Sequence, residues 1–116
     1  HSAERLHVAT GQAQALLKPD GALYHEFQGS IRAFVLDPPW GIIPKCAHDV
    51  ALTGDQINLL VERMVAFFPR KDQDAKGDGV ILVRLDSMSD QAKLWMDAFR
   101  KHKLYTSIVR IMDSLF

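Results

Sequence analysis

The sequence lacks several features that define whole classes of protein. Its 116 residues include one cysteine, Cys46, so an internal disulfide framework is excluded and a reducing compartment is favoured. The 14 basic residues match the 14 acidic ones, so nucleic-acid binding has to rest on a local site rather than on bulk positive charge. No apolar run approaches the roughly 20 residues that cross a bilayer. We therefore expect a soluble intracellular protein with no membrane partner. The expected location is the nucleus or the cytoplasm, and an organelle is an open alternative.

The remaining composition is that of one globular domain. Hydrophobic residues make up 47% of the chain and charged residues 24%, close to the globular average. We assign residues 1–116 to one α/β domain, because this length suits a single domain. Residues 1–30 predict a helix over residues 2–17, despite the low helix propensity of Gly11, and a short strand over residues 22–27.

Residues 31–112 alternate between strand and helix patterns. Apolar runs predict strands over residues 31–36, 80–85 and 105–112. With helices between them, this order is typical of right-handed βαβ units, and so of an α/β fold with a mostly parallel sheet and flanking helices. Because residues 31–36 are almost continuously apolar, we expect both faces of the sheet to be covered.

Capping and periodicity place the two helices of this region. Thr53 and Gln56 match a capping box at the start of the first helix, and Ser89 with Asp90 starts the second. Apolar residues at helical spacing predict the inner faces. These faces carry Ile57, Leu60, Val61, Met64, Val65 and Phe68 in the first helix, and Ala92, Trp95, Met96 and Phe99 in the second.

A rigid tetrapeptide follows the strand at residues 31–36. It consists of Asp37, Pro38, Pro39 and Trp40, and the prolines cannot continue a strand because they donate no ladder hydrogen bonds. In open α/β sheets, ligands bind just beyond the carboxyl ends of the strands. The tetrapeptide therefore stands where a ligand is expected. A simpler interpretation is that the prolines only end the strand and the tryptophan only covers the core.

The stretch Val35-Leu36-Asp37-Pro38-Pro39-Trp40-Gly41 resembles motif IV of the amino-group methyltransferases, the D/N/S-P-P-Y/F/W signature of enzymes that methylate adenine N6 or a similar exocyclic amine. The order of elements after it is similar too, so the resemblance covers residues 31–112. It implies a Rossmann-like class I methyltransferase fold, present in part, with S-adenosylmethionine as cofactor and RNA or DNA as substrate.

The resemblance also implies a role for each residue of the motif. Asp37, Pro38, Pro39 and Trp40 are the expected catalytic residues, with Asp37 also at the cofactor. An exocyclic amine on an aromatic ring is a poor nucleophile, because its lone pair is delocalised. Acceptors on Asp37 and the Pro38 carbonyl localise that lone pair and aim it at the methyl donor. Substrate binding is expected from Trp40, by stacking on the base, and from Gly41 and Lys45 in the following loop.

One part of the family pattern is missing. We find no G-x-G turn after a predicted strand to hold the methionine part of the cofactor; Gly11, Gly21 and Gly29 are isolated. The chain is then a fragment, part of a longer chain, or a reduced relative that has lost catalysis. The alternative function is a non-catalytic, methyltransferase-like subunit that binds a related partner. A third reading is an unrelated small α/β binding domain in which the motif is a coincidence.

The remaining chemistry-bearing residues have simpler structural interpretations. Cys46 and His48 are too close in sequence and too few for a zinc site, so no metal is expected. Trp95 and Phe99 have helical spacing and are assigned to the core. The basic cluster at residues 100–103 matches the charge preference of a helix C-terminus, and contact with a phosphate backbone is its alternative role.

Overall fold

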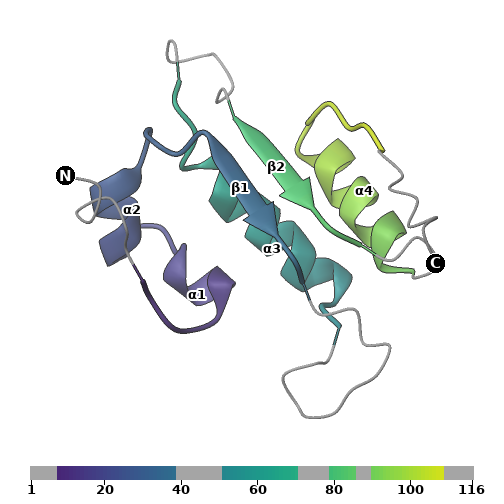
Figure 1. Cartoon of the computed structure of the whole chain (residues 1–116), viewed down its shortest axis with the longest axis horizontal. Helices are drawn as coiled ribbons and strands as arrows, with labels where there is room; N and C mark the ends of the chain where they lie inside the picture. The colour runs from purple at the N-terminus through teal and green to yellow at the C-terminus, as the bar shows by residue number, and fades with distance from the viewer. Residues whose placement is uncertain (1–7, 39–50, 71–78, 86–89, 109–116) are drawn as a thin grey trace, which may run out of the picture.

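The elements of the fold lie in four described stretches of chain. The computed structural model describes residues 8–38, 51–70, 79–85 and 90–108. Figure 1 shows two strands side by side with α3 behind β1, α4 next to β2, and α1 and α2 beside the sheet. In chain order the elements are α1 (Ala13–Leu16), α2 (Ala22–Phe27), β1 (Ala33–Leu36), α3 (Gly54–Val65), β2 (Val80–Val83) and α4 (Gln91–Lys101).

The sheet is a parallel pair formed across a helical crossover. β1 and β2 make a two-stranded sheet, with Ala33 opposite Val80 and Leu36 opposite Val83. The ladder continues past the strands, because the Arg84 amide donates to the Leu36 carbonyl at 2.9 Å. Since α3 lies between β1 and β2 in the chain, the described core is a βαβ unit. An α/β arrangement with a parallel sheet is therefore confirmed in this part of the chain.

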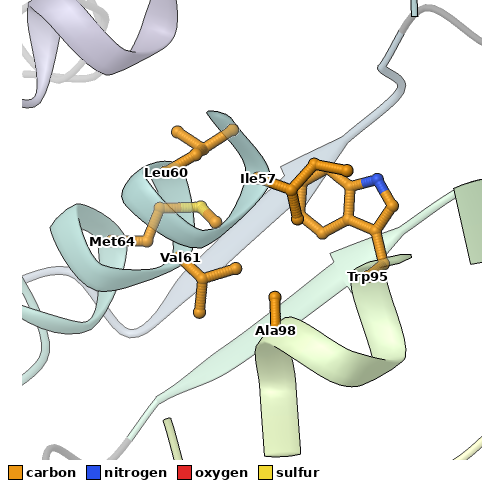
Figure 2. Packing of buried hydrophobic residues seen from close by; sticks show 6 residues of the cluster. All are labelled: Ile57, Leu60, Val61, Met64, Trp95 and Ala98. Atoms are coloured by element: carbon orange, nitrogen blue, oxygen red, sulfur yellow. The ribbon is translucent and has the colours of Figure 1, made fainter. Parts of the chain in front are cut away.

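The buried core is made mainly by α3 and α4. The capping box predicted at the start of α3 is present: the Gln56 amide donates to Thr53 Oγ1 at 3.2 Å, and the Thr53 amide donates to Gln56 Oε1 at 2.8 Å. The apolar face of α3 packs against Trp95 and Ala98 of α4, as Figure 2 shows. The buried residues of this core cluster are Ile57, Leu60, Val61, Met64, Trp95 and Ala98.

The inner face of α4 differs from the predicted one. Gln91, Trp95 and Ala98 are the buried residues of this helix, whereas Ala92 and Met96 are half-buried. The face is rotated because the side chain of Gln91 turns inward, where its Nε2 donates to the Leu52 carbonyl at 3.2 Å. This hydrogen bond ties the start of α4 to the residue just before the cap of α3.

Only one face of the sheet is covered by described elements. Phe34, Leu36, Ile81, Val83 and Leu85 pack against the α3–α4 core. The alternate side chains form an open face, on which Val35 is 77%, Leu82 57% and Val80 54% exposed. No described element crosses in front of the strands in Figure 1. The expectation that both faces of the sheet are covered is therefore wrong for the part of the chain described. The apolar run of β1 is not evidence that both of its faces are buried there.

The predictions for residues 1–30 need two corrections. Residues 22–27 form helix α2, not a strand: the His25 amide donates to the Gly21 carbonyl, and the ring of Tyr24 packs edge-on against Phe67 at 5.6 Å. Within the described residues, the helix predicted over residues 2–17 is present only as α1. Gly11 has a φ of +152°, which no helix can accommodate, so residues 8–12 lie outside it, and residues 1–7 are outside the described residues.

The third predicted strand has no counterpart among the residues described. Lys103, with a φ of +58°, ends the chain's helical path after α4. Residues 104–108 then follow without strand pairing, and the remainder of the predicted strand, residues 109–112, lies outside the described residues.

We expect Gly79→Ala to destabilise the fold by about 2 kcal/mol, because overpacking a filled core costs roughly 1–3 kcal/mol. Gly79 lies just before β2, and a Cβ at this position would overlap Cδ1 of the buried Phe68 ring, which follows α3. Urea unfolding measures the change in free energy. Gly54→Ala is the matched control, because a Cβ there meets nothing closer than 3.6 Å. Equal stability of the two variants would contradict this packing.

Candidate functional site

The start of the D-P-P-W motif lies at the carboxyl end of the sheet. Asp37 and Pro38 follow β1 directly, and the first residues of α3 and α4 lie at the same end in Figure 1. Because the two strands are parallel, this end also carries Arg84, the residue after β2. The structure thus places the start of the motif, Asp37 and Pro38, at the edge where α/β sheets bind ligands.

Asp37 and Arg84 face each other across the two strands. Both continue the open face of the sheet, and Arg84 Nη1 lies 3.8 Å from Asp37 Oδ2. Their side chains are 76% exposed for Arg84 and 66% for Asp37. The carboxylate is therefore an accessible acceptor beside a guanidinium. It is not the buried, desolvated acid that general-acid chemistry would require.

The other predicted site residues lie between β1 and α3 in the sequence. Pro38 is half-buried. Pro39, Trp40, Gly41 and Lys45 lie outside the described residues, as do Cys46 and His48. The structure therefore brings Asp37 and the Pro38 carbonyl to one edge, and the roles of the remaining motif residues stay predictions.

Sequence reasoning missed Arg84, although a signal for it exists. The apolar runs of β1 and β2 are each followed at once by a charged residue, Asp37 in one case and Arg84 in the other. In a parallel pair with this register, the two charges meet. A charged residue after an apolar run indicates its partner only when the register of the two strands is known.

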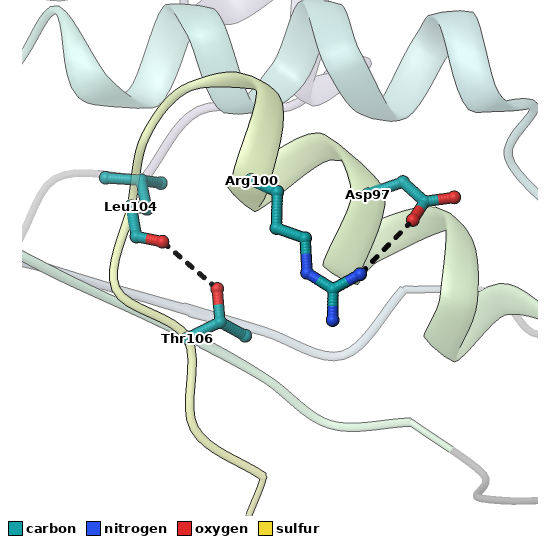
Figure 3. Close-up of polar contacts among 4 residues, drawn as sticks. All are labelled: Asp97, Arg100, Leu104 and Thr106. Atoms are coloured by element: carbon teal, nitrogen blue, oxygen red, sulfur yellow. Dashed lines mark hydrogen bonds and ion pairs between the residues drawn. The ribbon is translucent and has the colours of Figure 1, made fainter.

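The basic cluster is remote from the start of α4. Arg100 and Lys101 form the last turn of this helix, which is 11 residues long, so they lie about 14–15 Å along its axis from Gln91. Arg100 Nη1 contacts Asp97 Oδ1 at 4.0 Å, and Thr106 Oγ1 donates to the Leu104 carbonyl just beyond, as Figure 3 shows. This arrangement agrees with the helix-end role.

The described stretches hold no group of three or more His, Cys, Asp or Glu side chains arranged for a metal ion. They also hold no helix with the length and apolar character that spanning a membrane requires.

Comparisons with known proteins add no evidence about the motif. No protein-family model matches the chain, and neither the curated proteins nor the solved structures yield a match. The functional assignment therefore rests on the residues of the motif and on their position in the βαβ unit.

Replacing the carboxylate should leave the fold intact. We expect Asp37→Ala to change the free energy of unfolding by less than about 1 kcal/mol, because exposed ion pairs contribute about 0–1 kcal/mol. Met64→Ala, which opens a cavity in the buried core, should cost roughly 2–5 kcal/mol in the same urea titration. A loss at Asp37 as large as that at Met64 would show that the carboxylate has a structural role.

Proposed function

We propose that this chain is the amine-binding part of an S-adenosylmethionine-dependent N-methyltransferase, with adenine N6 in RNA or DNA as the favoured acceptor. One observation carries the proposal. The D-P-P-W motif starts directly after β1, at the carboxyl edge of a parallel βαβ unit, with an exposed carboxylate as its first residue. A proline pair that only ended the strand would not require an acceptor at this place.

The chemistry assigned to the motif is orientation of the amine. An exocyclic amine has two N–H groups, and Asp37 and the Pro38 carbonyl supply two acceptors on adjacent residues. Hydrogen bonds to these acceptors draw the nitrogen lone pair out of conjugation and fix its direction. Trp40 provides a flat face for the base, which has to leave a duplex to reach it. Most of the rate then comes from alignment, with no covalent enzyme intermediate.

The residues present fit the acceptor side better than the donor side. When bound, S-adenosylmethionine supplies an electrophilic methyl group. No described strand is followed by a G-x-G turn to hold it, since Gly77-Asp78-Gly79 precedes β2 in the sequence, and the predicted cofactor contact, Asp37, is in the described part. The proposal therefore assigns to this chain the binding and orientation of the amine, and leaves the grip on the methyl donor to residues outside those described.

A second candidate function is favoured by the open face of the sheet. Val35, Val80 and Leu82 present apolar side chains that no described element covers. Contiguous exposed apolar patches mark interaction surfaces. In this second reading, the chain is a non-catalytic, methyltransferase-like subunit whose sheet packs against a related partner.

Asp37→Ala should lower methyl transfer to an adenine-containing oligonucleotide by at least about 100-fold, the usual cost of removing a preorganised polar group at a reacting centre. Transfer of a labelled methyl group from S-adenosylmethionine measures the rate. Asp97→Ala removes an exposed carboxylate from α4 and serves as the matched control, with an unchanged rate expected.

Calorimetric titration with S-adenosylmethionine separates the two candidates. Binding to the native protein, together with an Asp37-dependent rate, supports the methyltransferase. An absence of binding and of turnover would leave the interaction subunit as the function. An active Asp37→Ala variant would remove the role given to the carboxylate.

Trp40→Ala should weaken binding of a single-stranded oligonucleotide by roughly 5- to 150-fold, because stacking of a base on an aromatic ring is worth about 1–3 kcal/mol. Fluorescence anisotropy gives the dissociation constants. Tyr105→Ala is the control, since this aromatic ring is 98% exposed and belongs to no part of the motif. Unchanged affinity and turnover in the Trp40 variant would instead favour the interpretation that the indole only covers the core.

A further inference from the structure

We propose that the open face of the sheet is the surface on which two copies of this chain pack together as a symmetric dimer. The open face consists of the exposed side chains of Ala33, Val35, Val80 and Leu82, with Asp37 and Arg84 at its carboxyl end. In naming the occupant of this face, the inference rests on the interaction role given above as the second candidate function. It does not depend on methyl transfer.

The open face exposes large aliphatic side chains on neighbouring strands. Val35 is 77% and Leu82 57% exposed, and the register pairs these two residues across the sheet. Leaving them in water forgoes about 25 cal/mol for each Å² of apolar surface that could be buried. Adjacent exposed side chains of this kind mark an interaction surface. A second sheet that packs face to face on this one covers them.

The rows of side chains on the open face determine which two-fold rotation suits it. Each row has one residue from β1 and one from β2, and the rows are Ala33 with Val80, Val35 with Leu82, and Asp37 with Arg84. A two-fold axis parallel to the strands lays β1 of one copy over β2 of the other and shifts nothing along the strands. Each row then meets its own copy with its two residues exchanged.

This exchange makes the open face complementary to itself. Val35 of each copy packs on Leu82 of the other, so aliphatic side chains meet aliphatic side chains. At the carboxyl end, Asp37 of each copy faces Arg84 of the other, so four charges alternate in sign at the rim of the interface. Charge complementarity of this kind fixes the register of a complex. The contacts within each chain are kept, since a guanidinium has five N–H donors and a carboxylate two oxygens.

A two-fold axis in the plane of the sheet but perpendicular to the strands is less favourable. It would lay the carboxyl end of one sheet over the amino end of the other. Asp37 would then face Ala33 of the second copy, and Arg84 would face Val80. Covering two charges with aliphatic surface costs their hydration and supplies no partner in return. The positions of the charges therefore select the axis along the strands.

The axis along the strands also brings the two candidate sites together. Both copies end their strands at the same end of the dimer, so the two motif starts, each beginning with Asp37, lie at one shared edge. Dimerisation therefore joins the two amine-binding edges of the proposed function instead of separating them.

Sedimentation equilibrium of the full chain over a range of concentrations tests for the dimer. Because an interface on one face of a two-stranded sheet is small, we expect a dissociation constant of roughly 1–100 μM. Leu82→Glu should weaken dimerisation at least about 10-fold, since it places a charge in the aliphatic centre of the interface. Leu59→Glu is the matched control, because it places the same charge on an exposed leucine of α3, and it should change the dissociation constant less than twofold.

A mixture of two charge variants tests the axis. Asp37→Arg and Arg84→Asp each place like charges opposite one another, so each variant alone should dimerise about 5- to 20-fold more weakly than the wild type. Mixed in equal amounts, they should associate about as well as the wild type, because every pair between copies is again of opposite sign. Each chain of the mixture still carries two like charges within itself, so this rescue can come only from contacts between copies.

Circular dichroism confirms that each variant is folded. The dimer is overturned if the wild-type chain stays monomeric at concentrations several times the upper end of the expected range. The assigned face is overturned if Leu82→Glu dimerises as the wild type does, and the axis is overturned if the mixed charge variants stay monomeric. A dimer without methyl transfer leaves this inference standing while the methyltransferase proposal fails. A monomer with an Asp37-dependent rate overturns this inference alone.

Discussion

The parallel pairing of β1 with β2 is the constraint on which the site depends. Because α3 returns the chain to the start of the sheet, both strands end at the same edge, and the residues that follow them become neighbours. Asp37 and Arg84 are 47 positions apart in the numbering, yet they face each other at 3.8 Å. An antiparallel pair would place these charges at opposite ends of the sheet, and no shared edge would exist.

The same pairing divides the sheet into two faces of different character. One face packs Phe34, Leu36, Ile81 and Val83 against α3 and α4, which anchors the strands. The other face carries exposed aliphatic side chains and ends in the Asp37–Arg84 pair. The two proposed functions therefore draw on adjoining parts of one surface, and a partner packed on the aliphatic part would also lie beside the carboxylate.

Local signals in the sequence predicted what is local in the fold. The Thr53–Gln56 capping box and the apolar spacing of α3 depend only on residues within one or two helical turns of each other, and both are confirmed. Residues 22–27 were assigned wrongly because six residues cannot separate a period of two from a helical one, and packing on Phe67 decides the outcome. The inward turn of Gln91 and the partnership of Arg84 depend on distant backbone, Leu52 and β1 respectively, which no local pattern reports.

The central claim is the parallel register that brings the two strand ends together, and solution NMR tests it most directly. A scalar coupling across the hydrogen bond from the Arg84 amide to the Leu36 carbonyl, together with contacts between the methyl groups of Val35 and Leu82, is the predicted result. Antiparallel pairing would instead give contacts from Val35 to residues at the start of β2, and later residues of β1 would contact earlier residues of β2. That result would contradict the account, because Asp37 and Arg84 could then not share an edge.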